Sequence, residues 1–215
     1  MKKFIRHEYD DIGRIYVFDD DSRYYSVTTI LGNTKNKDFL EEWRKRMGRK
    51  RADAITKIAG ETGTSVHELL ELYLLKEESK TRPNNYIKNL TKQIIPYINK
   101  KVSDVKRTEA VLYSDVYKIA GTVDALVIYD GKLCILDFKT ANKQPKSEWI
   151  KDYLLQLAIY AMMIEEETGT KIDYGCLLFA YKRVKSRRNE VFVQLDQYKE
   201  QAKKRIEIFQ NTINA

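Results

Sequence analysis

The chain has 215 residues, of which 43% are hydrophobic and 33% are charged. This composition is typical of a folded globular protein with one sizeable core, and it excludes a disordered chain. No apolar run approaches the roughly 20 residues that span a bilayer, so a membrane protein is not expected. The net charge of +8 favours a polyanionic partner such as nucleic acid, although surface solubility explains it equally well.

The N-terminal segment indicates the cellular compartment, and the number of cysteines indicates whether an iron–sulfur cluster can be bound. MKKFIRHEYDD is basic but lacks the apolar run of a signal peptide, so we expect a cytoplasmic protein. Cys134 and Cys176 are far apart in sequence, and two cysteines cannot hold a four-thiolate iron–sulfur cluster. We therefore expect no iron–sulfur cluster and place both cysteines in the core.

We expect one domain over residues 1–215, whose first part, 1–105, is a hairpin followed by mostly helical segments. RIYVF and YYSVTTIL flank the acidic turn DDDSR and predict two strands, with a helix after Asn36. Residues 38–59 predict a helix that carries many cations. Residues 84–101 predict another helix, interrupted or bent near Pro96.

Between these two segments, a second helix is expected to begin after a pair of glycines. Gly60 and Gly63 precede Ser65 and Glu68, which have the spacing of an N-terminal capping box. This pattern places His67 in the first turn of that helix.

The second part, residues 106–215, is expected to hold the sheet. TEAVLYS, AGTVDALVIY and KLCILDFKT are rich in the β-branched, aromatic and aliphatic residues of buried strands. A long helix then ends at Gly169. YGCLLFAYKRV and EVFVQLD predict two more strands around a basic turn, and an amphipathic helix closes the chain. The expected fold is α/β, with a central mixed sheet flanked by helices.

Two of these strands are joined by Asp130-Gly131, a dipeptide typical of a two-residue hairpin turn. Counting back from this turn sets Asp124 opposite Asp137. Alternation along the strand places Lys139 on the same face as Asp137, one pleat further on. Two opposed carboxylates destabilise a sheet unless something compensates for their repulsion.

A divalent hard cation is a natural compensation, because Mg²⁺ binds carboxylates, water and phosphate oxygens. Such an ion polarises a phosphoryl oxygen and acidifies a bound water, while Lys139 stabilises negative charge or orients that water. This chemistry is phosphodiester hydrolysis. The alternative is an ordinary Asp–Lys salt bridge at the end of a sheet.

The segment GTVDALVIYDGKLCILDFKT resembles the G-x-x-D and D-x-K core of RecB-type nucleases of the PD-(D/E)XK superfamily. YYSVTTIL and FLEEWRKRMG are similar to the mitochondrial genome maintenance exonuclease-like family of that superfamily. The resemblance implies a restriction-endonuclease-like core, with an N-terminal helical region over the active site. It also implies one or two Mg²⁺ or Mn²⁺ ions with Lys139 as catalytic lysine. The implied metal ligands are His67, Asp124, Asp137 and the backbone carbonyl of Phe138.

The resemblance assigns three further residues to the site. Glu109 precedes the first core strand and would touch a second metal or its water, although a glutamate on a strand is usually just exposed. Gln156 and Tyr160 share a helix face at i and i+4 and would contact DNA and support the active site. Their alternative role is that of buried hydrogen-bonding residues.

Two basic runs are candidates for phosphate binding, with solvated surface as the alternative. The residues 44–51 carry six cations on a predicted helix. The predicted turn KRVKSRR contributes Lys182, Arg183, Lys185, Arg187 and Arg188. Trp43, Tyr73 and Tyr86 are candidates for stacking against bases.

Together these features predict a metal-dependent DNA exonuclease that acts on single strands with a free end. One alternative is a structure-specific or restriction-type endonuclease on the same core. A second is a nucleic-acid-binding subunit without hydrolytic activity.

Overall fold

A computed structural model describes residues 3–9, 13–35, 38–80, 82–183 and 188–213. The strands are β1 (Phe4–Tyr9), β2 (Gly13–Phe18), β3 (Arg23–Ser26), β4 (Val102–Ser114), β5 (Ile119–Tyr129), β6 (Lys132–Ala141), β7 (Tyr174–Tyr181) and β8 (Glu190–Gln194). The helices are α1 (Val27–Asn33), α2 (Asp38–Met47), α3 (Arg49–Leu75), α4 (Asn85–Thr91), α5 (Ile95–Lys101), α6 (Ser147–Thr168) and α7 (Asp196–Ile213).

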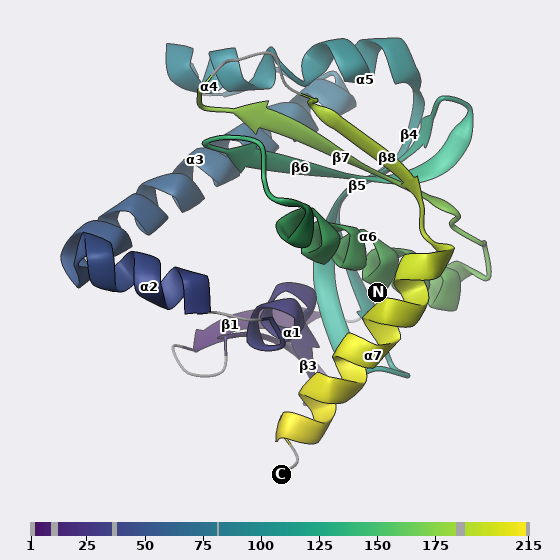
Figure 1. Cartoon of the computed structure of the whole chain (residues 1–215). Helices are drawn as coiled ribbons and strands as arrows, with labels where there is room; N and C mark the ends of the chain where they lie inside the picture. The colour runs from purple at the N-terminus through teal and green to yellow at the C-terminus, as the bar shows by residue number, and fades with distance from the viewer. Residues whose placement is uncertain (1–2, 10–12, 36–37, 81, 184–187, 214–215) are drawn as a thin grey trace.

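These elements form one mixed sheet with helices on both faces, as the sequence predicts (Figure 1). The strand order is β1-β2-β3-β5-β6-β7-β8, and β4 pairs with β5. The pairs β3–β5 and β6–β7 are parallel, and the other pairs are antiparallel. The chain crosses from β6 to β7 through α6, because parallel neighbours need a long connection.

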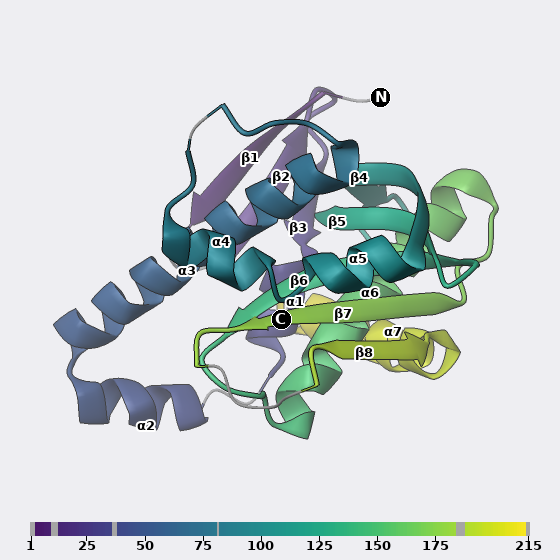
Figure 2. The same cartoon turned by 90° about the horizontal axis from the view of Figure 1, so that it is seen from above.

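Two apolar layers hold the helices to the sheet. Helices α1, α6 and α7 pack on one face, where α6 alone is buried continuously from Leu154 to Ile164. Helices α3, α4 and α5 pack on the opposite face (Figure 2). Burying one Leu or Ile side chain stabilises a fold by about 1.5–3 kcal/mol, so each layer contributes a large share of the driving force. Helix α2 has no buried residue and projects beyond both layers (Figure 2).

The hairpin between β5 and β6 has the predicted turn and register. Asp130 and Gly131 have φ angles of 49° and 74°, as a turn that requires two positive φ values demands. The ladder runs from Tyr129–Lys132 to Ala125–Leu136, which is the register that the turn predicts. It ends there, one position before Asp124 would face Asp137.

The prediction for the residues around His67 is wrong, because α3 is one continuous helix. It begins after Gly48, whose φ is 77°, and passes through Gly60 and Gly63 without interruption. His67 therefore lies in the C-terminal half of a 27-residue helix and not in a first turn. Each internal glycine costs about 1 kcal/mol relative to alanine. Burial of the apolar residues that follow offsets this cost; these are Val66, Leu70 and Leu74.

A segment that was predicted as strand is helical, and one strand was missed. VTTIL is not strand but helix α1, because the Ser26 side chain caps the helix by accepting a 3.0 Å hydrogen bond from the backbone N–H of Thr29. Strand β1 was not predicted. The helix over 84–101 is interrupted as expected, with Pro96 in the first turn of α5.

Cys134 and Cys176 are both fully buried in the layer formed with α3, α4 and α5, so their prediction as core residues is confirmed. Within the described residues, no helix combines the length and apolar character needed to cross a membrane.

Candidate active site

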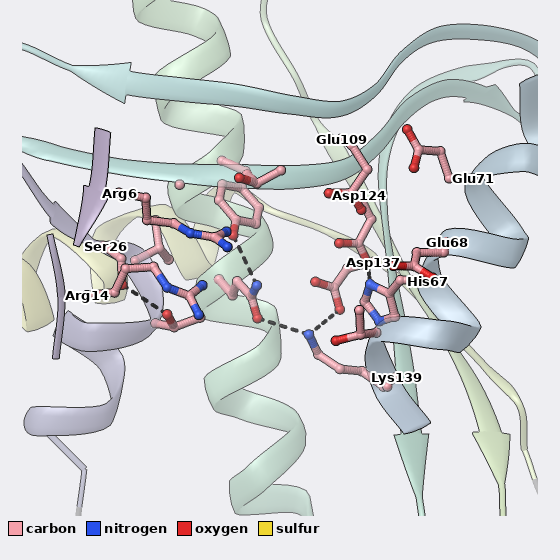
Figure 3. Close-up of a pocket in the computed structure, with 18 of the residues that line it drawn as sticks. Arg6, Arg14, Ser26, His67, Glu68, Glu71, Glu109, Asp124, Asp137 and Lys139 are labelled. Carbon is pink, nitrogen blue, oxygen red and sulfur yellow. Dashed lines mark hydrogen bonds and ion pairs between the residues drawn. The ribbon is translucent and has the colours of Figure 1, made fainter. Parts of the chain in front are cut away.

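The site lies where β5 changes its neighbour. On one edge β5 pairs with β3 at Ile119 and Ala120, and with β6 only from Ala125 onward. In the described sheet, the residues 121–124 thus have no strand partner on that edge. A pocket of about 690 Å³ opens at this gap, and α3, α6 and the β1–β2 hairpin also contribute residues to it (Figure 3).

Asp124 is held at the gap by two contacts. Its Oδ2 accepts a 2.7 Å hydrogen bond from the backbone N–H of Phe138 and lies 3.3 Å from Nδ1 of His67. Burial would raise the pKa of Asp124, but the hydrogen bond from His67 and the charges of His67 and Lys139 lower it below its ordinary value. Burial lowers the pKa of His67, but the hydrogen bond to Asp124 and the charge of Asp124 raise it. The pKa of His67 therefore lies above its ordinary value. The contact with His67 therefore stabilises the ionised form of Asp124.

Asp137 is 1% exposed, and its Oδ1 has no hydrogen-bond partner within the described chain. Its close partner is Lys139, whose Nζ lies 2.5 Å from Oδ2. Burial raises the pKa of Asp137 to about 6; Lys139 opposes this rise, and the charge of Asp124 adds to it. Oδ1 of this buried carboxylate is left without a partner among the described residues, and a metal cation beside it would stabilise the charge.

Lys139 is positioned by residues from α6. Its Nζ donates a 3.1 Å hydrogen bond to Oε1 of Gln156, and Nε2 of Gln156 donates a 3.2 Å hydrogen bond to the hydroxyl of Tyr160. The same Nζ lies 4.9 Å from the centre of the Tyr153 ring. Gln156 and Tyr160 are 9% and 3% exposed, and both line the pocket. The structure therefore brings both predicted residues to the site, Gln156 as a direct partner of the lysine and Tyr160 as the partner of Gln156.

Glu109 joins the site from β4. It has a φ of 42°, a strained value for a residue other than glycine and one that is often found at functional sites. One ligand atom each from His67, Glu109 and Asp124 lie within 4.8 Å of one another. Burial, together with the charges of Asp124 and Glu71, raises the pKa of Glu109 to about 7.

This donor set fits a divalent cation. Five carboxylates and one imidazole line the pocket, against one ammonium and two guanidinium groups, and hard cations prefer such oxygen donors. The three-residue group contains Glu109 in place of the predicted Asp137, which lines the same pocket. For Phe138 the structure shows only its backbone N–H on Asp124, so the role of its carbonyl stays a prediction.

The predicted basic turn lies at the same end of the sheet as the site. Tyr181 pairs with Ala141, two residues beyond Lys139, and Lys182 and Arg183 follow directly. Arg183 and Arg188 are exposed, whereas Lys185 and Arg187 lie outside the described residues. Neither this turn nor the run 44–51 lines the pocket in the described part of the chain. DNA contact by either run stays a prediction.

Two basic residues of the pocket were not predicted from the sequence, namely Arg6 from β1 and Arg14 from β2. Arg14 is the first residue of the predicted strand RIYVF. The neighbouring strand β1, which carries Arg6, was not predicted. Strand β1 is mostly exposed and shows little apolar alternation, so the sequence carries no strong signal for Arg6.

Comparison with known proteins agrees with this geometry. Residues 39–215 match the family model described as the PD-(D/E)XK nuclease superfamily. Human mitochondrial genome maintenance exonuclease 1 is 30% identical over 168 residues, a match that covers 73% of this chain and 49% of the human protein. The mouse protein of the same name is 28% identical over 167 residues, with the same shares. The chain thus spans about half the length of these curated relatives.

Among solved structures, an alkaline exonuclease from Laribacter hongkongensis is similar over 89% of this chain and 88% of that chain, with a TM-score of 0.43 and 12% identity. The family match covers most of the sequence and includes Asp124, Asp137 and Lys139, which the fold gathers in one pocket. The chain belongs to the PD-(D/E)XK nuclease superfamily.

Proposed function

We propose that the protein is a metal-dependent deoxyribonuclease that hydrolyses phosphodiester bonds, and that it acts on single-stranded DNA with a free end. The observation that carries this proposal is the convergence of Asp124, Asp137 and Lys139 in one pocket with His67 and Glu109. The exonuclease relatives support the end-dependent mode of action.

Each residue has a role in this proposal. Asp124, His67 and Glu109, with Asp137 beside them, would hold one or two Mg²⁺ or Mn²⁺ ions, which would polarise the phosphate and acidify a water. Lys139 places its ammonium near the carboxylates and stabilises the negative charge that develops on the phosphate. Gln156 keeps this ammonium in place through its 3.1 Å hydrogen bond.

A groove beside the active site supports the proposal that the substrate is single-stranded. Helices α2 and α6 line a cavity of about 870 Å³, where the rings of Phe39 and Trp149 lie 5.6 Å apart. These side chains are 50% and 43% exposed, and Nζ of Lys146 lies 5.5 Å from the Phe39 ring. Tyr153 lines this groove and also contacts Lys139, so the groove adjoins the site. Exposed aromatic rings beside lysines suit unpaired bases and their phosphates.

A substrate panel tests the proposal. End-labelled linear single strands, the same strands circularised, and blunt duplex are incubated with Mg²⁺, with Mn²⁺ or with EDTA. With metal, we expect linear strands to be degraded rapidly and duplex slowly. The circles should remain intact. Cleavage of circles at the rate of linear strands would favour the endonuclease alternative. Binding without cleavage under any metal condition would favour a non-catalytic nucleic-acid-binding subunit.

The groove has its own test. Trp149→Ala should weaken binding of single strands, since stacking is worth about 1–3 kcal/mol per base. Tyr86→Ala is the matched comparison, because Tyr86 is similarly exposed, at 47%, and does not line the groove. If Tyr86→Ala weakened binding and Trp149→Ala did not, the bases would stack elsewhere, at the position suggested by the sequence.

A further inference from the structure

Two arginines line the wall of the pocket away from His67. Arg6 comes from β1 and Arg14 from β2, and both side chains extend from the N-terminal hairpin toward the interior of the pocket (Figure 3). The carboxylates Asp124, Asp137 and Glu109 lie on the other side. The pocket therefore has an acidic wall and a basic wall.

The hairpin register explains why both arginines face this pocket. Arg6 pairs with Tyr16 and Glu8 pairs with Arg14, so alternation places these four residues on one face. The hydroxyl of Tyr16 lies 3.3 Å from Oγ1 of Thr122, which is two residues from Asp124 on β5. This contact fixes the hairpin face relative to the acidic residues.

The backbone of Arg14 is also fixed. Its N–H donates a 2.8 Å hydrogen bond to Oγ1 of Thr29, and this hydroxyl donates a 3.1 Å hydrogen bond to the Arg14 carbonyl. Thr29 is buried in α1. The base of the Arg14 side chain is thus held by a rigid element, which favours binding of a ligand in one orientation.

Arg14 has a guanidinium donor that lacks an acceptor. Nε of Arg14 is buried without a hydrogen-bond partner in the described chain, and its nearest acid is Glu8, which is 71% exposed and lies 3.4 Å from a terminal nitrogen. Among the described residues, neither arginine forms an ion pair with Asp124, Asp137 or Glu109. A buried donor without an acceptor destabilises the protein until an anion supplies one.

We propose that Arg6 and Arg14 bind a phosphate group of the substrate strand, next to the phosphodiester that lies at Asp124, Asp137 and Lys139. This inference rests on the proposed function and adds a second phosphate site to it. A guanidinium group presents a planar set of donors that matches two phosphate oxygens. The basic wall offsets the repulsion between a polyanionic strand and the three carboxylates opposite.

The phosphate has two possible sources, an internal position of the strand or its terminal phosphate. Both present the same oxygens to the arginines. Oligonucleotides of one sequence that carry a 5′-phosphate, a 3′-phosphate or only hydroxyl ends separate the two sources.

The experiment measures binding of these fluorescent oligonucleotides in EDTA over a salt series, for wild type, Arg6→Gln, Arg14→Gln and Arg14→Lys. Arg23→Gln is the matched control, because Arg23 is exposed on β3 and does not line the pocket. We expect each glutamine variant to bind about tenfold or more weakly. The slope of log affinity against log salt should fall by about 0.7 for each lost contact. Arg14→Lys should keep the salt slope but bind more weakly than wild type, because an ammonium lacks the paired donors.

If the terminal phosphate is bound, the glutamine variants lose the preference for one phosphorylated end; if an internal phosphate is bound, they weaken all oligonucleotides equally. Either result supports the inference. Folded Arg6→Gln and Arg14→Gln proteins with wild-type affinity and salt slope would overturn it while leaving the nuclease proposal intact. A wild-type protein that neither bound nor cleaved DNA would overturn both.

Discussion

Lys139 and Gln156 come from β6 and α6, and a 3.1 Å hydrogen bond from Nζ to Oε1 joins them across the pocket. Gln156 also donates to Tyr160, so its amide orientation is determined by contacts at both ends. An ammonium that is held between Asp137 and Gln156 already has its position before a substrate binds, so no reorganisation of the lysine is needed. Gln156 is thus a positioning residue for the lysine.

Replacing Gln156 by Met tests this role, because methionine is similar in size but cannot accept this hydrogen bond. We expect the single-turnover cleavage rate to fall by about tenfold or more, with little change in DNA affinity. Gln197→Met is the control, since Gln197 is exposed on α7. An unchanged rate in folded Gln156→Met would show that Lys139 does not depend on this contact.

His67 and His7 are the two histidines of the chain, and they offer a matched pair for metal binding. His67→Ala should weaken Mn²⁺ binding by about tenfold or more, since one ligand beside Asp124 is lost. His7 is exposed on β1 and does not line the pocket, so His7→Ala should bind Mn²⁺ as wild type does. Titration calorimetry measures both. Equal affinities in the two variants would assign His67 a structural role.

Gly121 permits the close approach of α6 to β5. A Cβ atom at this position would lie 2.8 Å from Cε1 of Tyr160 and 3.1 Å from Cγ2 of Val27. Gly121→Ala should therefore reduce the free energy of unfolding by about 1–3 kcal/mol and displace Tyr160. Gly60→Ala should instead raise it by up to about 1 kcal/mol, because Gly60 lies inside α3 with nothing within 4 Å of its added Cβ. Urea unfolding of both variants measures the difference, and a loss of stability in Gly60→Ala alone would contradict this packing argument.

The raised pKa of Glu109 predicts that wild type and Glu109→Gln differ in stability in a pH-dependent way when no metal is bound. Its pKa is about 7 when folded, against an ordinary value of 4.5, so ionisation of the folded state destabilises it. This penalty is absent below about pH 4.5, grows as the pH rises toward 7 and is complete above that. Glu109→Gln should thus raise the melting temperature at pH 8 and leave it unchanged near pH 4.5. Because solvent screens this exposed group, we expect a difference of only about 1–3 °C.

Thermal melts in EDTA at the two pH values check this prediction. Glu77→Gln is a suitable control, because Glu77 is exposed beyond the end of α3 and does not line the pocket. An equal effect of Glu109→Gln at both pH values would contradict the raised pKa.

Local chemistry in the sequence predicted the β5–β6 hairpin well. Asp130 and Gly131 require a particular turn, and the turn determines the register as far as Ala125. The sequence did not show that the ladder ends there, because that depends on β3 and β6 pairing with different parts of β5. The gap that forms the pocket is a property of the whole sheet.

Predictions failed where tertiary packing opposed local preference. Gly60 and Gly63 indicated a break, but burial of the residues that follow keeps α3 intact and places His67 beside Asp124. Arg6 was missed because β1 is mostly exposed, with little of the apolar alternation that predicts a strand. Its place at the site follows from pairing with β2.

The most direct test of the central claim compares wild type with Asp137→Asn for cleavage of linear single-stranded DNA in Mn²⁺ and in EDTA. Asparagine preserves the shape of the buried side chain but removes its charge, so the protein should remain folded by circular dichroism. We expect wild type to cleave only with metal and Asp137→Asn to lose at least about a hundredfold in rate. Wild-type cleavage by folded Asp137→Asn, or cleavage by wild type in EDTA, would contradict a metal-dependent site at Asp124, Asp137 and Lys139.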